Sequence, residues 1–377
     1  MKVIIVGTAY PYRGGLAAFN ERLATEYRRQ GYEVKIYTFR LQYPAFLFPG
    51  KTQYSTGSQP PVLDITRRIN SVNPFNWLKT GRMIKKEKAD LLIFAYWMAF
   101  MAPCFGTIAK LSRTKGVKRI GLIHNMIPHE PNLLDKIFPK YFIKQMDAFI
   151  ALSGSVAEDI AKFDRQDKPK AVSPHPLYDH FGEKISRKEA LAFLNLDDNV
   201  RYMLFFGFIR DYKGLDLLLK AFADEGLRKL NVKLIVAGEF YNNSKRYFDL
   251  ENELNLSGRV LWYSDFIPDS EVKYFFNAAD IVVQPYKSAT QSGVTQIAYH
   301  FEKPMLVTNV GGLSEIVPNG KAGYAVDPDE KEIAAKLTGF FENKRFDDFQ
   351  QGILEEKQKY GWDILVKAID NITKSIP

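Results

Sequence analysis

Short apolar runs alternate with amphipathic stretches along the first half of the chain. Residues 2–7 predict a buried strand, and residues 14–31 predict a helix because their apolar positions recur at spacings of three and four. Strands are also predicted at residues 33–39, 91–96, 118–125 and 147–153, and a helix at 154–163. Strands that alternate with helices predict a parallel sheet with helices on both faces.

The pattern starts again after a stretch rich in Pro, His and charge, residues 167–184, which is typical of a linker. Strands are predicted at residues 201–208, 232–238, 259–266, 279–286, 304–310 and 323–328, with a helix at 215–227. We therefore expect two Rossmann-like α/β domains, residues 1–175 and 184–358. In the remaining segment, 359–377, a final helix would pack back across the boundary. Ligands of such sheets bind beyond the carboxyl ends of the strands, so two facing sheets would form one cleft.

One apolar stretch has the length of a membrane span. Residues 91–109 contain no charge. Pro103 and Gly106 interrupt the stretch, and Asp90 and Lys110 flank it, which favours a buried strand, a turn and a buried helix over the alternative of a transmembrane helix. The apolar run at the N-terminus is too short for a secretory signal.

Composition and charge indicate the number of domains, the cellular location and the kind of partner. A length of 377 residues favours two domains. The single cysteine, Cys104, excludes an internal disulfide and suits the cytoplasm. The net charge is +9, and residues 1–180 carry 27 Lys and Arg against 14 Asp and Glu. This excess favours an anionic partner such as lipid headgroups or nucleic acid, with a solvated charged face as the alternative. The five histidines and the cysteine show no metal-ligand spacing, so we predict no metal.

Glycine-rich turns after strands are the main candidates for chemistry. Gly14 and Gly15 open the first helix, where bare backbone N–H groups can approach an anion; a tight structural turn is the alternative. The spacing is not that of a dinucleotide-binding fingerprint, and Arg40 follows the second strand where an acidic residue would be expected, which disfavours an NAD-dependent dehydrogenase. In the second domain, Arg210 and Lys213 precede a helix N-terminus, where two cations could hold a diphosphate.

A polar cluster follows the strand at residues 279–286. Its hydroxyls and backbone N–H groups could bind a phosphate or a sugar. The cluster would form a ligand-binding surface opposite Arg210 and Lys213. The cluster consists of Thr290, Gln291, Ser292, Gly293, Val294 and Thr295. Glu315 lies in the first turn of a later helix, where a capping role is the alternative, and His124 ends a first-domain strand, where a structural role is equally open.

The order and spacing of several segments resemble the retaining glycosyltransferases of the GT-B fold, family 4 or group 1 type, over nearly the whole chain. The matching segments include "YPYRGGLAAFNERLA", "HNMIPHE", "LFFGFIRDYKGLDLLLKAF" and "QSGVTQIAYHFEKPMLVTNVGGLSEIV". The resemblance implies that His124 contacts the transferred sugar and that Arg210 and Lys213 bind the diphosphate of the donor. It also implies a set of donor-binding residues: Gly14, Gly15, Gly207, Gly238, Thr290, Gln291, Ser292, Gly293, Val294, Thr295 and Glu315.

The chain departs from the family pattern at two places. The family has two glutamates eight positions apart around the polar cluster, and here neither the region of Ala289 and Thr290 nor Ile297 supplies one. In the family pattern the second glutamate binds the nucleotide ribose. Here Gln296 or Thr295 would take that role, or the ribose would be bound in another way. The usual arginine after the strand glycine is Phe208, for which Arg210 would substitute.

The resemblance therefore implies transfer of a sugar from a nucleoside-diphosphate sugar to a hydroxyl, with retention of anomeric configuration. The acceptor would be a saccharide or a lipid-linked saccharide in cell-surface polysaccharide or glycolipid synthesis. No metal or other cofactor and no nucleic acid partner is expected. The enzyme would be cytoplasmic, with peripheral contact at the anionic inner face of the membrane. The alternatives are a nucleotide-sugar epimerase, a glycan phosphorylase, or a non-catalytic nucleotide-sugar-binding protein of the same fold.

Overall fold

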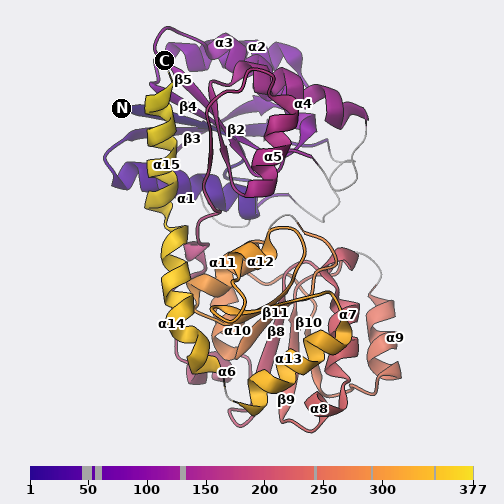
Figure 1. Ribbon diagram of the computed structural model, residues 1–377. Helices are drawn as coiled ribbons and strands as arrows, with labels where there is room; N and C mark the ends of the chain where they lie inside the picture. Colours follow the sequence, from indigo (N-terminus) through magenta and orange to yellow (C-terminus); the bar gives the residue numbers. More distant parts are fainter. Residues whose placement is uncertain are drawn as a thin grey trace. The chain divides into compact units, whose positions relative to one another are not determined.

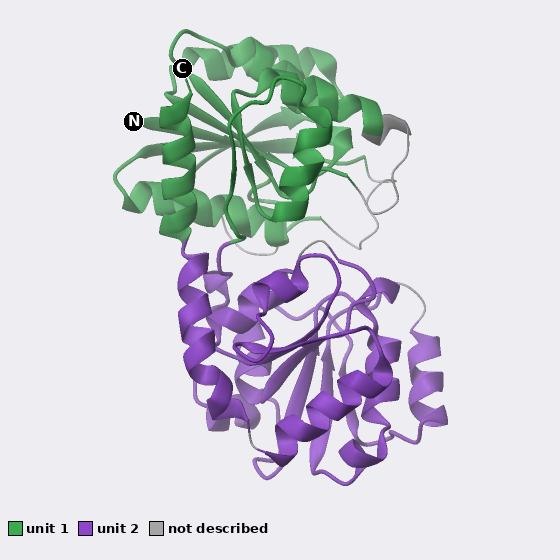
Figure 2. Ribbon diagram, in the orientation of Figure 1, with its two compact units in different colours: residues 1–175, 362–377 green, residues 176–361 purple. Residues whose placement is uncertain are grey.

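The structure is a computed structural model that describes residues 1–44, 53–55, 62–127, 133–241, 244–289, 292–343 and 345–376, without the side chains of residues 133–135. The chain forms two compact units (Figure 2). Unit 1 comprises residues 1–175 and 362–377, and unit 2 comprises residues 176–361. Each unit is built on one sheet in which all the strand pairs are parallel, the α/β class that the alternating pattern predicts.

Unit 1 contains a seven-stranded sheet in the order β3-β2-β1-β4-β5-β6-β7 (Figure 1). Its strands are β1 (Lys2–Val6), β2 (Glu33–Leu41), β3 (Asp64–Asn70), β4 (Leu91–Tyr96), β5 (Lys118–Ile123), β6 (Ala148–Ala151) and β7 (Lys170–Val172). Its helices are α1 (Gly15–Arg29), α2 (Pro74–Lys86), α3 (Ala102–Ser112), α4 (Leu133–Gln145), α5 (Gly154–Phe163) and α15 (Trp362–Ser375), with a 3₁₀ turn at Ala99–Met101.

Helices cover both faces of this sheet. Because successive side chains of a strand point to opposite faces, each strand contributes residues to two cores. Val3 and Ile5 of β1 belong to a core shared with α1 and α15, whereas Ile4 and Val6 belong to a core shared with α3 and α4. Helix α15, from the end of the chain, packs beside α1. Burial on both faces explains why these strands read as continuous apolar runs.

The apolar stretch at residues 91–109 forms a buried strand and then a buried helix. Strand β4 pairs with β1 and β5, and α3 contributes Cys104, Phe105 and Ile108 to the core. The prediction of a strand, a turn and a helix is confirmed. Among the helices that the structure describes, none is long and apolar enough to cross a membrane.

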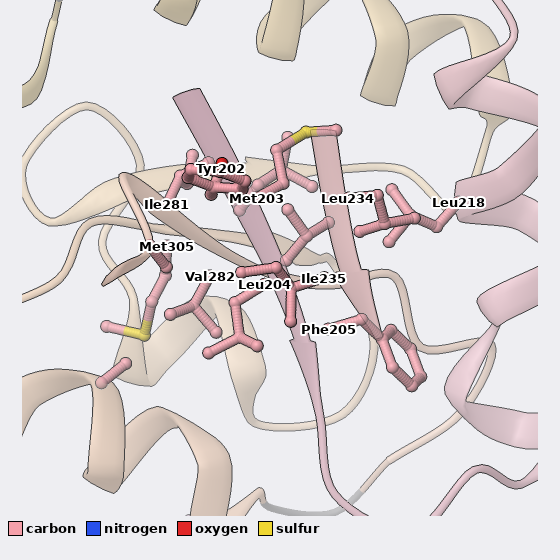
Figure 3. Packing of buried hydrophobic residues seen from close by; sticks show 14 of the residues in the cluster. Tyr202, Met203, Leu204, Phe205, Leu218, Leu234, Ile235, Ile281, Val282 and Met305 are labelled. Carbon is pink, nitrogen blue, oxygen red and sulfur yellow. The ribbon is translucent and has the colours of Figure 1, made fainter. Parts of the chain in front are cut away.

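Unit 2 contains a six-stranded sheet in the order β10-β9-β8-β11-β12-β13. Its strands are β8 (Arg201–Phe206), β9 (Val232–Ala237), β10 (Val260–Tyr263), β11 (Ile281–Gln284), β12 (Met305–Thr308) and β13 (Gly323–Val326). Its helices are α6 (Arg187–Phe193), α7 (Leu215–Phe222), α8 (Glu225–Arg228), α9 (Lys245–Glu253), α10 (Val272–Ala278), α11 (Gly293–His300), α12 (Leu313–Ile316), α13 (Glu330–Glu342) and α14 (Phe346–Lys357). Three 3₁₀ turns lie at Asp179–Phe181, Asp211–Lys213 and Gln358–Tyr360. Figure 3 shows apolar side chains of β8, β9 and β11 packed together in its core.

Two elements differ from the sequence-based expectation. The helix predicted at residues 215–227 ends at Phe222, because the side chain of Asp224 accepts a hydrogen bond from the backbone N–H of Gly226 and starts the separate helix α8. The predicted linker at residues 167–184 begins with a strand, since Lys170–Val172 pairs with β6 as the edge strand β7.

Candidate functional site

The order of strands reverses once in each sheet, between β1 and β4 in unit 1 and between β8 and β11 in unit 2. Ligands of open parallel sheets bind beyond the carboxyl ends of the strands at such reversals. In unit 2 this point is formed by the loop from Gly207 to Gly214 and by residues 285–289 and 292, the described part of the loop after β11. These two loops therefore form the candidate site of unit 2, and the corresponding edge of unit 1 forms a second candidate site.

The two loops of unit 2 are locked together. Gly214 has a φ of +68°, and a Cβ at this position would lie 1.9 Å from the carbonyl oxygen of Pro285. The backbone N–H of Lys287 donates to the carbonyl of Tyr212 at 2.7 Å, and the Lys287 ammonium pairs with Asp216. Only glycine allows so close an approach, so Gly214 fixes the position of the loop that carries Arg210 and Lys213.

Lys213 is a buried cation at the centre of this site. Its side chain is 8% exposed, and the ammonium lies 5.7 Å from the centroid of the Tyr286 ring. A Cβ on Gly207 would lie 3.0 Å from this ammonium. Among the described residues, no hydrogen-bond or ion-pair acceptor contacts Nζ. Burial, reinforced by the charge of Arg210, lowers the pKa of Lys213 to about 8.

Arg210 lies beside Lys213 and is partly exposed. Its guanidinium lies 4.0 Å from the centroid of the Tyr241 ring, in a loop that pairs with its own through a bridge between Ile209 and Phe240. Gly238 makes this pairing close, because a Cβ there would lie 2.4 Å from the carbonyl oxygen of Gly207. Both cations therefore lie in the loop that follows β8, and the loop that follows the neighbouring strand β9 packs against Arg210 through Tyr241.

The described residues of the polar cluster, 292–295, lie at the start of helix α11, with Ser292 as its N-cap. The hydroxyl of Ser292 accepts a hydrogen bond from the N–H of Val294 and contacts the Tyr286 hydroxyl at 3.1 Å. The Thr295 hydroxyl donates to the carbonyl of Ser292. Val294 reaches the other loop, since its Cγ2 lies 3.8 Å from the Cβ position of Gly207. Tyr286 thus links Ser292 to Lys213, and the structure brings the described residues of the cluster and the cation together within unit 2.

Two glutamines at this edge have buried polar atoms without partners. Gln296 is 1% exposed, and neither its Oε1 nor its Nε2 has a hydrogen-bond partner. The Oε1 of Gln284, the last residue of β11, is also unpaired. A buried polar group without a partner costs about 1–3 kcal/mol, so such groups need a specific explanation.

In unit 1, the loop after β1 and the first turn of α1 form the corresponding edge. Gly14 has a φ of +102°, both Gly14 and Gly15 are exposed, and no side chain caps the helix. The Asn20 amide donates to the carbonyl of Thr8 at 2.8 Å, while the Asn20 Oδ1 and the Thr8 hydroxyl are buried and unpaired. This edge therefore offers uncapped backbone N–H groups and unpaired polar atoms.

His124 follows β5, as the sequence predicts. Its backbone N–H donates to the carbonyl of Tyr96, and its ring Nε2 is buried without a partner. The ring of Phe19 contacts both His124 and His175, with centroid distances of 4.5 Å and 4.9 Å, and the two imidazoles lie 6.2 Å apart. Burial, and then the proximity of His175, lowers the pKa of His124 to about 3, so the imidazole is neutral over the physiological range.

The remaining predicted site residues are distributed as follows. Glu315 is exposed on the short helix α12, and Gly293 is exposed next to the ring of Tyr178. Thr290 and Gln291 lie outside the described residues. Within the described part of the chain, no group of three or more His, Cys, Asp or Glu side chains could hold a metal ion.

Sequence reasoning missed three side chains of these sites. Tyr286, Gln284 and Phe19 are all buried, and the sequence reads them as strand or helix residues. Only the position of Gln284 and Tyr286 at the end of a strand could have indicated them, since ligands meet parallel sheets at that edge.

Comparisons with known proteins identify the class of this enzyme. Residues 186–360 match the model of the glycosyl transferases group 1, and residues 13–176 match that of glycosyltransferase family 4. The chain belongs to this family and is a glycosyltransferase with the GT-B fold of two Rossmann-like domains.

Two relatives and one solved structure illustrate the match. The chain is 24% identical to an uncharacterized glycosyltransferase of Methanocaldococcus jannaschii, over 99% of this chain and 98% of the relative. It is 23% identical to a D-inositol 3-phosphate glycosyltransferase of Streptomyces scabiei, over 94% of this chain and 85% of the relative. HepE of Anabaena, solved in complex with UDP and glucose, superposes with a TM-score of 0.74 at 15% identity, over all of both chains.

Proposed function

We propose that this glycosyltransferase moves a sugar from a nucleoside-diphosphate sugar to a hydroxyl acceptor and retains the anomeric configuration. The observation that carries this proposal is the buried Lys213 ammonium, which has Arg210 beside it and no acceptor among the described residues. A cation held in this way is costly unless an anion binds it, and a diphosphate supplies that anion. The complex of HepE with UDP and glucose supports a nucleotide donor of this kind.

The expected mechanism is mainly electrostatic. Departure of the nucleoside diphosphate leaves an oxocarbenium-like centre, and Arg210 and Lys213 stabilise the negative charge that develops on the leaving diphosphate. An oxygen of the leaving diphosphate takes the proton of the acceptor hydroxyl as the new glycosidic bond forms on the same face of the sugar. No enzymic nucleophile is needed in this scheme, and the two cations do the work that a metal ion would do.

The ribose and the sugar need further partners. Gln296 is buried at the start of α11 with both amide atoms unpaired, and we assign it to the ribose hydroxyls in place of the family's second glutamate. We assign the neutral imidazole of His124 to a hydroxyl of the transferred sugar. A neutral imidazole can donate or accept a hydrogen bond without charging, which suits a contact that persists through the reaction.

The proposal for the acceptor is based on the excess of positive charge in the first half of the chain. We propose a saccharide or lipid-linked saccharide acceptor in cell-surface polysaccharide or glycolipid synthesis, with peripheral contact at an anionic membrane. Phe75, at the start of α2, is 82% exposed and could insert among lipid headgroups. Co-sedimentation with anionic vesicles tests this contact: Phe75→Ser should reduce binding, and equal binding by variant and wild type would exclude Phe75.

Donor screening followed by product analysis tests the proposed reaction. The full chain should melt at a higher temperature with one of the UDP-, GDP-, ADP- or dTDP-sugars, because a bound donor stabilises the folded state. With that donor and an acceptor, NMR of the product should show the anomeric configuration of the donor. Inversion would overturn the retaining mechanism, and the absence of any donor effect would overturn the nucleotide-sugar assignment.

A further inference from the structure

Positively charged side chains gather in unit 1 at the amino ends of β5 and β6, away from the candidate site that contains His124. Two adjoining cavities of about 390 Å³ and 440 Å³ share Arg113, Asp147 and Ile376. We call them together the basic hollow; residues 113–119, 144–147, 166, 168 and 376 line it. Strand β5 has six residues and separates the hollow from His124 by about 20 Å at roughly 3.3 Å per residue. The hollow is therefore distinct from the candidate site of unit 1.

The only acidic side chain among the described residues that line the hollow is already neutralised. The carboxylate of Asp147 accepts hydrogen bonds from the Arg119 backbone N–H at 2.9 Å and from its guanidinium Nε at 3.0 Å, and a further one from Nη2. Arg119 is 2% exposed, so this pair is fixed. Arg113 approaches the same carboxylate only to 3.9 Å. Asp147 is therefore occupied by Arg119 and does not balance the other cations of the hollow.

Three further cations of the hollow, Lys115, Lys144 and Lys168, have no carboxylate hydrogen-bond or ion-pair partner among the described residues. The Lys168 ammonium donates to the backbone carbonyl of Ile143 at 2.7 Å, which positions the charge without neutralising it. Burial, opposed in part by Asp164 and Asp147, lowers the pKa of Lys168, and the charges of Arg119 and Arg113 lower it further. Lys115 and Lys144 are exposed at the rim, and among the described residues neither has an acidic partner. An anion in the hollow would relieve this repulsion.

The residue types favour a phosphate group. A guanidinium presents a planar fork of donors that matches phosphate oxygens, and lysines add point charges around it. The hollow is open and larger than a single phosphate, which favours a phosphate carried on a larger molecule. We infer that the basic hollow of unit 1 binds a phosphate ester through Arg113, Lys144 and Lys168, separately from the sugar-transfer site. A phospholipid headgroup and a soluble phosphate monoester share this chemistry.

Titration calorimetry with sn-glycerol 3-phosphate tests the inference for a soluble ligand. The full chain should carry Lys213→Met so that the candidate donor site does not contribute. Arg113→Gln with Lys144→Gln should weaken binding by about tenfold or more, since each contact to phosphate is charge-assisted. The matched control, Arg28→Gln with Lys79→Gln, removes the same charge from exposed positions of unit 1 outside the hollow and should change affinity by less than about twofold.

Vesicles of phosphatidylglycerol in phosphatidylcholine test the lipid source with the same variants. Loss of binding in the hollow variant with either probe supports the inference, and the probe that binds identifies the source. Equal losses in the hollow and control variants would overturn it in favour of general electrostatics. Absence of binding to both probes, or binding only to a mixed-sequence oligonucleotide, would also overturn it.

Discussion

The ammonium of Lys213 lies 5.7 Å from the centroid of the Tyr286 ring, and this contact joins the loops that follow β8 and β11. The Tyr286 hydroxyl in turn contacts the Ser292 hydroxyl at 3.1 Å. The buried cation is thus held against a π face and not against a carboxylate. A cation–π contact can hold a charge in place while leaving it unneutralised, which suits a residue whose counter-ion is a substrate.

Replacement of Lys213 by methionine should separate function from stability. Lys213→Met keeps the apolar stem and removes a buried, unpaired charge, so the free energy of unfolding should be unchanged or higher. Donor turnover should fall by about a hundredfold or more, because stabilisation of the leaving diphosphate is lost. Urea denaturation and initial-rate kinetics with the identified donor measure the two effects.

Lys303 supplies the matched control. It is also 8% exposed with its pKa lowered to about 8, mainly by burial, but its ammonium donates to the carbonyl of Asn277 and lies outside the candidate site. Lys303→Met should leave the kinetics close to wild type. Similar rate losses in the two variants, or a wild-type rate in Lys213→Met, would contradict the role of Lys213.

The lowered pKa of Lys213 predicts a pH dependence. The free enzyme should lose the cation near pH 8, so kcat/KM should fall above that pH. A bound diphosphate favours the charged form and should shift the decline in kcat to higher pH. The free energy of unfolding depends on pH in the opposite direction. The folded state binds fewer protons than the unfolded state between about pH 8 and 10.5, so the contribution of Lys213 to stability rises with pH in this range. Both effects should vanish in Lys213→Met, and their persistence would assign them to another group.

The contact of Gly214 with Pro285 predicts a loss of both stability and donor binding. Gly214→Ala places a Cβ 1.9 Å from the Pro285 carbonyl oxygen, so the two loops must separate. Gly320 is the matched control, because it also has a positive φ, +80°, but nothing lies within 4 Å of its Cβ position. Gly320→Ala should cost about 1 kcal/mol, and Gly214→Ala more than about 2 kcal/mol. Chemical denaturation and the thermal shift with donor measure this; equal costs would mean that the close approach is not what fixes the loop.

Most of the strands that the sequence predicts correctly are central strands with buried side chains, although the edge strands β10 and β13 of unit 2 were also predicted. The apolar runs of the central strands are nearly continuous, as in β4 and β9. The sequence analysis missed β3 and β7, which lie at the two edges of the unit 1 sheet. Edge strands have a neighbour on one side only, and "DITRRIN" and "KAV" are largely not buried. Such segments lack the apolar pattern on which the prediction depends.

The sequence indicated which loops would form the candidate site, but it did not indicate which of their side chains are buried or unpaired. Glycines and cations after strands indicated the loop at Gly207 and Lys213 and the start of α11. The burial of Lys213 could not be foreseen, since it depends on Tyr286, some seventy residues later in the chain. The unpaired amide of Gln296 is likewise a property of tertiary packing, and no local pattern of the sequence shows it.

Gln296 should be more important for the donor than for the fold. Gln296→Leu removes an amide whose oxygen and nitrogen are both unpaired, so the free energy of unfolding should be unchanged or higher. Donor affinity should fall by about tenfold if the amide holds the ribose. In the control, Asn277→Leu, a buried amide that donates to the Lys273 carbonyl is lost, so stability should fall and donor affinity should not. Unaltered donor affinity in Gln296→Leu would remove this residue from the site.

The neutral state of His124 predicts an acid-sensitive fold. With a pKa of about 3 in the folded protein against about 6.5 in an unfolded chain, His124 takes up a proton only on unfolding between these values. The unfolded state then binds more protons, so stability from this group is present above about pH 6.5 and is lost as the pH falls toward 3.

Replacement of His124 by glutamine removes this term, because glutamine does not titrate. The unfolding free energy of the wild type should fall relative to His124→Gln by at most about 1.4 kcal/mol per pH unit between about pH 6 and pH 4. His180→Gln, at an exposed histidine of unit 2, is the control and should follow the wild type. Urea denaturation at several pH values measures the difference. If the unfolding free energies of the wild type and His124→Gln changed with pH in parallel, the pKa of His124 would not be lowered. The assignment of a neutral imidazole to the sugar hydroxyl would then be wrong near pH 6.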